Sequence, residues 1–173
     1  MGGDGDISYP RGLYSVALGV EDLRRFLRER GVDAEVVEAG EAWSSAAAAA
    51  SLGVPLDAVA KTVVFVGDGG EPVLVVLPGG RRVDQRGLAR ALGYRRLRLA
   101  RRGEVLEATG YEPGAVPPVG HARRVRVVVD RALLGRGWVY AGGRQPEALA
   151  EDQARRHRGP GGRGGCGCAV PGW

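Results

Sequence analysis

Several residue types are almost missing from this chain of 173 residues. Asparagine is absent, and lysine, isoleucine and methionine occur once each, as Lys61, Ile7 and Met1. Because AT-rich codons specify these residues, the pattern indicates a GC-rich coding sequence in which arginine supplies nearly all the positive charge. A single retained lysine favours a site that needs a compact ammonium group rather than a planar guanidinium. A chance survivor on the surface is the alternative.

Nucleophiles and metal ligands are also scarce, which excludes several classes of enzyme. The histidines are His121 and His157, the cysteines are Cys166 and Cys168, and five serines occur, none in a G-x-S-x-G motif. A Ser-His-Asp triad, a zinc site and a phosphate-binding P-loop are therefore not expected, and no metal or other cofactor is predicted. His121 is a candidate base beside a proline-rich loop, with a structural role as the alternative.

Long hydrophobic runs are missing too. No stretch approaches the roughly 18 apolar residues of a membrane-spanning helix. The first residues, MGGDGDISYPRG, lack the charged and apolar segments of a secretory signal. We therefore expect a cytoplasmic protein without a membrane partner. Its content of 44% hydrophobic and 26% charged residues is typical of a globular domain.

Positive charge is concentrated in one part of the chain. The net charge is +5, and residues 81–102 hold nine arginines against a single acid, Asp84. Such a cluster is typical of proteins that bind polyanions, although a solvated helix and strand surface is the alternative. Nucleic acid is the favoured partner, and the arginines predicted to contact its phosphates are Arg81, Arg82, Arg86 and Arg95.

Hydrophobic periodicity and turn residues predict alternating helices and strands. We expect helices over 21–31, 45–52, 84–93, 103–110 and 146–158, and strands over 32–37, 61–66, 71–77, 94–100, 123–130 and 137–143. The GDGG sequence at 67–70 predicts a hairpin between two central strands. The chain is thus predicted to hold an N-terminal extension (1–18), one α/β domain on a mixed sheet (19–158) and a disordered Gly/Arg-rich tail (159–173).

A loop rich in glycine and proline, GYEPGAVPPVG at 110–120, is the other distinctive segment. Its glycines allow backbone N–H groups to approach a ligand, and its prolines fix the path of the chain. Such a loop could donate hydrogen bonds to an oxyanion or exclude bulky substrates; a loop kept tight for folding is the alternative. A protein with so little catalytic machinery needs an activated substrate, such as the aminoacyl ester of a tRNA.

Five motifs in order, AVAKTVVF, LPGGRRVD, TGYEPGAVPPVGH, VVVDRALL and VYAGG, resemble the YbaK family over residues 21–150. This family is the free-standing relative of the editing domain of bacterial prolyl-tRNA synthetases. The resemblance implies a mixed sheet curled into a partial barrel with surrounding helices. It also implies a trans-editing aminoacyl-tRNA deacylase that hydrolyses the ester of mischarged tRNA, with Ala- or Cys-tRNA(Pro) as the expected substrate.

The resemblance also assigns site residues. The catalytic assignments are Lys61, Gly114 and Asp130. The residues expected to bind the aminoacyl group are Ala115, Val116, Pro117, Pro118, Gly120, His121 and Gly142. Many family members carry a serine near the late glycine pair, where this chain has Tyr140–Gly143, so the choice between alanine and cysteine stays open.

Mischarged tRNA is the expected partner, and an aminoacyl-tRNA synthetase is a further candidate. Two other functions compete with the deacylase. One is a non-catalytic tRNA- or RNA-binding module of the same fold, and the other is a regulatory domain that recruits a synthetase. Retention of Lys61 and of the Gly114–Pro118 loop favours the enzyme.

Overall fold

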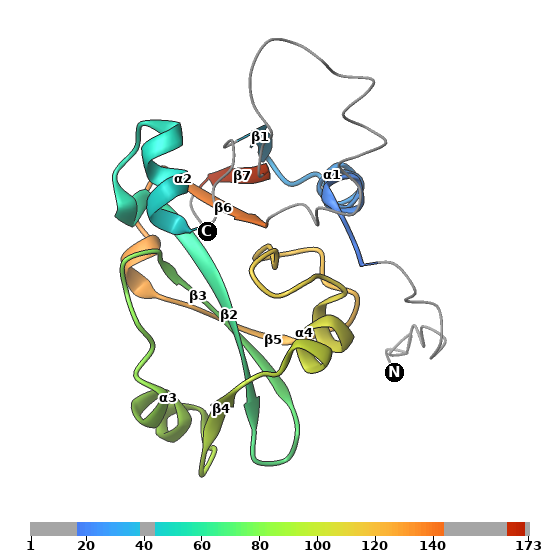
Figure 1. Ribbon diagram of the computed structural model, residues 1–173, viewed down its shortest axis with the longest axis vertical. Coiled ribbons are helices and arrows are strands. Elements are labelled where there is room, and N and C mark those ends of the chain that lie inside the picture. Colours follow the sequence, from blue (N-terminus) through green and yellow to red (C-terminus); the bar gives the residue numbers. More distant parts are fainter. Residues whose placement is uncertain (1–16, 39–43, 144–165, 172–173) are drawn as a thin grey trace, which may run out of the picture.

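The computed structural model describes residues 17–38, 44–143 and 166–171 of the chain (Figure 1). Its helices are α1 (Val20–Glu29), α2 (Ser45–Leu52), α3 (Gln85–Leu92) and α4 (Arg102–Thr109), with short 3₁₀ helices η1 (Leu56–Ala58) and η2 (Arg131–Leu133). Its strands are β1 (Glu35–Glu38), β2 (Val59–Gly67), β3 (Pro72–Pro78), β4 (Leu97–Leu99), β5 (Arg126–Val129), β6 (Trp138–Gly143) and β7 (Cys166–Pro171). None of the described helices is long and apolar enough to cross a membrane.

Within the described residues the strands form one seven-stranded mixed sheet. The order is β1-β7-β6-β2-β3-β5, and β4 pairs with β2 outside this path. The β2–β6 and β3–β5 pairs are parallel, and the other pairs are antiparallel. In Figure 1 the β6, β7 and β1 end of the sheet crosses the direction of β2 steeply, so the sheet curls as expected.

Strand β2 is the centre of the sheet. One edge pairs with β3 from Ala60 to Val66, which confirms the predicted hairpin. The other edge is shared, because β6 pairs with Val59 and Ala60 while β4 pairs with residues 65–67. Among the described strands, none pairs with residues 61–63 on this second edge. Lys61 therefore lies at the point where the strand loses its parallel neighbour.

Capping residues fix the helices where the sequence predicts them. The Ser44 hydroxyl accepts a hydrogen bond from the Ala47 N–H, and Gly53 ends α2 in the left-handed conformation. Helix α3 begins in the same way at Asp84, whose carboxylate accepts a hydrogen bond from the Gly87 N–H, and ends at Gly93. These short polar caps satisfy N–H groups that the first helical turn leaves without partners.

The two faces of the β2–β3 hairpin pack against different elements. On one face, Phe65, Val75 and Leu77 form a core cluster with Ala89 of α3 and Leu97 of β4. The opposite face carries two clusters. Val64 and Leu74 pack with Val105, Tyr111 and Val116, and Ala60 and Val76 pack with Leu133, Val139 and Ala141. Buried apolar area on both faces explains why both strands are almost continuously hydrophobic.

The prediction that the whole tail is disordered is wrong. Residues 166–171 of the tail form strand β7, which pairs with β1 on one side and β6 on the other. Glycine-rich sequence has low strand propensity, but pairing on both edges satisfies the backbone groups of β7. At the other end, the Leu18 N–H donates to the Gly110 carbonyl at 2.7 Å, and the predicted boundary between residues 18 and 19 stays a prediction. The predicted helix over 146–158 and tail residues 159–165 lie outside the described residues.

Adjacent leucines at the end of η2, Leu133 and Leu134, offer a matched test of this core. Leu133 is fully buried, with 0% exposure, whereas Leu134 is 42% exposed. We expect Leu133→Ala to lower the free energy of unfolding by about 2–5 kcal/mol, because it leaves a cavity against β3 and β6. Leu134→Ala should change it by less than about 0.5 kcal/mol. Chemical denaturation of both variants decides the point, and equal losses would contradict the packing described.

Candidate functional site

The ammonium group of Lys61 is held by the turn that follows β3. Lys61 is half-buried, and its Nζ donates a hydrogen bond of 2.9 Å to the Gly79 carbonyl. The Gly79 N–H in turn donates to the Val59 carbonyl at 2.7 Å, which ties the turn to the start of β2. One of the three ammonium donors is thus used by the protein, and two remain for a ligand.

The pairing between β2 and its parallel neighbour β6 ends just before Lys61. Ala60 pairs with Ala141 of β6 in parallel register, and this is the last pair between the two strands before Lys61. Tyr140 pairs with Val59, so both residues lie on the same face of the sheet as Lys61. The expected role of Gly142 in binding the substrate stays a prediction.

Asp130 binds the same turn after β3 through the side chain of Arg81. Its carboxylate accepts a hydrogen bond from the Ala132 N–H at 2.8 Å and caps η2. Arg81 Nη1 lies 3.3 Å from both carboxylate oxygens, and the Arg81 N–H donates to the Pro78 carbonyl. The bonds of Asp130 therefore join η2 to the turn that holds Lys61, and none of them reaches Lys61 itself.

The Gly114–Pro118 loop packs on the face of the β2–β3 hairpin that carries Val64 and Leu74, opposite to the face that packs against α3. Gly114 is exposed with a φ of 85°, a conformation that favours glycine, and the Ala115 N–H donates to the Glu112 carbonyl. Ala115, Val116, Pro117 and Pro118 are all buried. Val116 packs against Val64 and Leu74, so its side chain belongs to the core. Within the described residues, no hydrogen bond occupies the Gly114 N–H, which is free to meet a ligand.

His121 braces this loop. Its Nε2 lies 2.8 Å from the Pro117 carbonyl, and since a carbonyl only accepts, the neutral ring carries its proton on Nε2. Burial of the ring lowers the pKa of His121 below its ordinary value of 6.5, although the bond to Pro117 opposes this shift. Gly120 has a φ of 78° and lies against Leu23 and Phe26 of α1. Both residues hold the loop in place, and their predicted contact with substrate stays a prediction.

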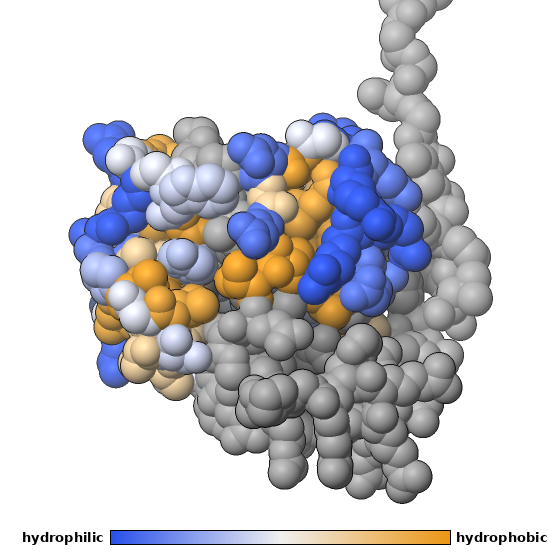
Figure 2. Space-filling view, turned by 90° about the horizontal axis from the view of Figure 1, so that it is seen from above, coloured by the Kyte–Doolittle hydropathy of each residue, from blue (hydrophilic) through white to orange (hydrophobic). Residues whose placement is uncertain are grey.

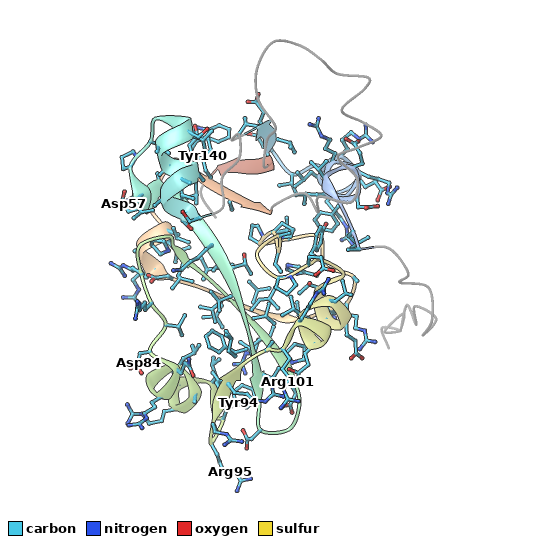
Figure 3. All side chains as sticks on the ribbon, in the orientation of Figure 1. Asp57, Asp84, Tyr94, Arg95, Arg101 and Tyr140 are labelled. Atoms are coloured by element: carbon cyan, nitrogen blue, oxygen red, sulfur yellow. The ribbon has the colours of Figure 1, made fainter. Side chains whose placement is uncertain are left out.

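The arginines of residues 81–102 fall into two groups. Four have carboxylate partners, in the pairs Arg81–Asp130, Arg95–Asp68, Arg98–Glu104 and Arg102–Glu112. The hydrogen bond from Arg98 lowers the pKa of Glu104 to about 2. Five others are exposed and make no ion pair with the described residues: Arg82, Arg86, Arg90, Arg96 and Arg101. Figure 3 shows Arg95 directed away from the body of the protein near β4.

Sequence reasoning missed Gly79, whose carbonyl is the acceptor for Lys61. The only signal for it was the PGG sequence between two predicted elements. The search for metal ligands finds no group of three or more His, Cys, Asp or Glu side chains that could hold an ion within the described ranges. The chemistry that these residues offer is an ammonium group, free backbone N–H groups and a cationic surface, which suits a negatively charged ligand or an oxyanion.

Comparison with known proteins identifies the family. Residues 40–154 match the aminoacyl-tRNA editing domain family. The uncharacterized protein YwhH of Bacillus subtilis is 36% identical over 86 residues, which are 50% of this chain and 54% of that protein. A proline–tRNA ligase of Nitratidesulfovibrio vulgaris is 38% identical over 103 residues, 59% of this chain and 18% of the ligase. The chain thus spans about half the length of the first relative and less than a fifth of the second.

Solved structures agree with this match. The hypothetical protein APE2540 superposes with a TM-score of 0.69 at 30% identity, covering 87% of this chain and 88% of that one. A protein described as a proposed trans-editing enzyme for prolyl-tRNA synthetase superposes with a TM-score of 0.71 at 28% identity, covering 90% and 88%. These similarities confirm the predicted single α/β domain of the editing-domain type.

The shifted pKa of His121 predicts how stability depends on pH. Because the folded state disfavours the charged ring, the unfolded chain binds the proton more readily near pH 6.5. The contribution of His121 is therefore present above pH 6.5 and is lost as the pH falls through the lower folded-state value. We expect His121→Gln, which keeps a donor for Pro117, to lose less melting temperature than the native chain between about pH 7.5 and pH 5. Parallel melting curves would contradict this assignment.

Proposed function

Since the chain belongs to the aminoacyl-tRNA editing domain family, we propose that it hydrolyses the ester of mischarged tRNA, with alanyl- or cysteinyl-tRNA(Pro) as substrate. The observation that carries the proposal is that the family match over residues 40–154 includes both Lys61 and the Gly114–Pro118 loop. The half-buried ammonium group of Lys61 and its bond to Gly79 support a role for Lys61 in chemistry rather than on a solvated surface.

Each group has a role in the proposed reaction. Lys61 would use its two remaining donors to hold the terminal phosphate or the aminoacyl carbonyl. The Gly114 N–H would stabilise the oxyanion, a contribution of about 3 kcal/mol for a well-placed donor. Water attacks the carbonyl carbon, the bond to the ribose oxygen breaks, and that oxygen takes a proton to restore the tRNA hydroxyl. The free ribose hydroxyl of the substrate is proposed to activate the water.

Selectivity would follow from size. A synthetase rejects a smaller amino acid only weakly, because one missing methylene is worth about 1–3 kcal/mol. A second site too small for proline can hydrolyse the smaller error and spare the correct product. Buried Pro117 and Pro118 make the loop a rigid wall for such a site, and the buried Val116 side chain supports that wall from the core.

The arginine surface is proposed to receive the acceptor stem of the tRNA. Arg82 and Arg86 are the preferred phosphate contacts, because they are exposed and make no ion pair with described residues. Arg81 and Arg95 would each have to exchange a carboxylate for a phosphate. Such contacts position the substrate without selecting its sequence.

A synthetase is proposed as a second partner. Leu56, Leu134 and Trp138 are 38%, 42% and 50% exposed. The salt bridge between Asp57 and Arg136 joins the segments that carry them. Figure 2 shows hydrophobic residues between strongly hydrophilic ones on the face seen from the α2 end. An exposed aromatic residue with apolar neighbours is the kind of surface that protein partners bury.

Loss of label from alanyl-tRNA(Pro) on adding purified protein tests the proposal, with prolyl-tRNA(Pro) as the control. We expect alanine to be released and proline to be spared. If alanyl-tRNA(Pro) survives, cysteinyl- and seryl-tRNA are the next substrates. Tight binding of tRNA with no release from any of them would favour the non-catalytic RNA-binding module.

Lys61 provides the sharpest test by substitution. Lys61→Ala removes the ammonium group, and Lys61→Arg replaces it with a guanidinium that cannot make the same compact contact. We expect both variants to lose roughly 10²-fold or more in deacylation rate, as expected for loss of one transition-state contact. Single-turnover deacylation measures the rate, and circular dichroism checks the fold. Native rates in a folded Lys61→Ala variant would refute the role of Lys61.

Salt dependence tests the arginine surface. The association constant K of tRNA falls as salt increases, and each lost phosphate contact should make the plot of log K against log salt less steep by about one unit of slope. We expect this change for Arg82→Gln and for Arg86→Gln, and a smaller one for Arg95→Gln, because Asp68 already engages that side chain. Filter binding of uncharged tRNA at several salt concentrations gives the slopes. Equal changes in all three variants would show that the Arg95–Asp68 pair does not matter.

A further inference from the structure

We infer that Gly79 is a positioning residue for Lys61, and that only glycine at this position lets its carbonyl hold the ammonium group. The inference rests on the proposed role of Lys61 in deacylation. It starts from the hydrogen bond of 2.9 Å between Lys61 Nζ and the Gly79 carbonyl, the one contact that the described residues give this ammonium group. The position of the Gly79 carbonyl therefore determines the position of the Lys61 ammonium group.

The N-terminus of α2 approaches Gly79 too closely for a side chain. A Cβ added at Gly79 would overlap Ser45 Cβ and lie 2.9 Å from Ser45 Oγ and 3.1 Å from Leu56 Cδ1. Ser45 is the first residue of α2, and the Ser44 cap fixes the helix there. Since Ser45 Cβ is next to the backbone, it cannot rotate away. Any larger residue must move either α2 or the turn.

Gly80 provides a natural contrast. A Cβ added there would meet only Leu56, at 3.2 Å from Cδ2, which is the end of a flexible and exposed side chain. Neither Gly79 nor Gly80 has a positive φ, so alanine suits the backbone at both positions. The two glycines thus differ in what surrounds them and not in their conformation, and only Gly79 carries the carbonyl that binds Lys61.

The far end of the turn is fixed independently. The Arg81 N–H donates to the Pro78 carbonyl, and the Arg81 guanidinium binds Asp130. With Arg81 held by Asp130 and the Gly79 N–H held by Val59, a clash at Gly79 is relieved most easily by rotation of the peptide between them. That rotation turns the Gly79 carbonyl away from Lys61.

The activity test compares the two glycines. Gly79→Ala should lower kcat about 10-fold or more, because a shift of 1 Å in a catalytic group can cost up to about 10²-fold. KM should stay nearly unchanged, because the arginine surface rather than Lys61 provides most of the tRNA affinity. Gly80→Ala should keep both constants close to native values. A native kcat for Gly79→Ala, or an equal loss for Gly80→Ala, would overturn the inference.

Removal of the clash provides a rescue. Ser45→Gly deletes the Cβ and Oγ that an alanine at position 79 would meet. We expect the double variant Gly79→Ala/Ser45→Gly to regain most of the lost kcat, and Ser45→Gly alone to behave like the native protein. A general folding defect would make the double variant worse than either single one. A double variant as slow as Gly79→Ala would therefore overturn the steric explanation.

The single lysine permits a readout that does not need activity. Protein grown with lysine labelled with ¹³C at Cε gives one lysine Cε signal, that of Lys61. An ammonium group held by Gly79 should make the two Hε protons inequivalent, and Gly79→Ala should merge them. If no tRNA is deacylated, the proposed function fails while this spectrum still decides the inference. Merged Hε signals in the native protein would overturn it.

Discussion

The architecture depends on one continuous interaction, the pairing of β2 with β3. The register runs without interruption from Ala60 opposite Pro78 to Val66 opposite Pro72. This hairpin carries a core on each face, and its outer edges recruit the remaining strands of the path, β6 on β2 and β5 on β3. Because β6 and β4 occupy opposite ends of one edge of β2, the sheet must bend around the residues between them. Lys61 lies at that bend.

The hairpin also explains how a charged side chain can lie in a buried strand. An ammonium group withdrawn from water without a partner is costly, so Lys61 needs an acceptor near the core. The chain leaves β3 directly after Pro78, and the first carbonyl beyond the strand, that of Gly79, fills this need. The parallel pairing with β6 ends one residue before Lys61. Strand register and the turn after β3 thus place the charge and its acceptor together.

Local rules predicted the features that local interactions determine. The β2–β3 hairpin and the tight loop at Gly114 follow from their turn residues, and α2 and α3 lie where the sequence predicts helices, with Ser44 and Asp84 as their caps. Strand β7 could not be predicted, because its partners β1 and β6 are distant in the chain. The arginine surface was predicted only as a charge, since the Arg81–Asp130 pair spans 49 residues and the Arg95–Asp68 pair 27. Asp130 accordingly holds Arg81 of the turn after β3, and its position after a strand could not indicate this role.

The identity of Lys61 in a chain so rich in arginine follows from the geometry of its acceptor. The Gly79 carbonyl lies close to the start of β2, and a compact ammonium group can donate to it while keeping two donors for a ligand. A guanidinium is longer and planar, and its donors diverge in a fixed fork. Genomic drift toward arginine is therefore opposed here by the shape of the site, in contrast to the exposed surface of α3.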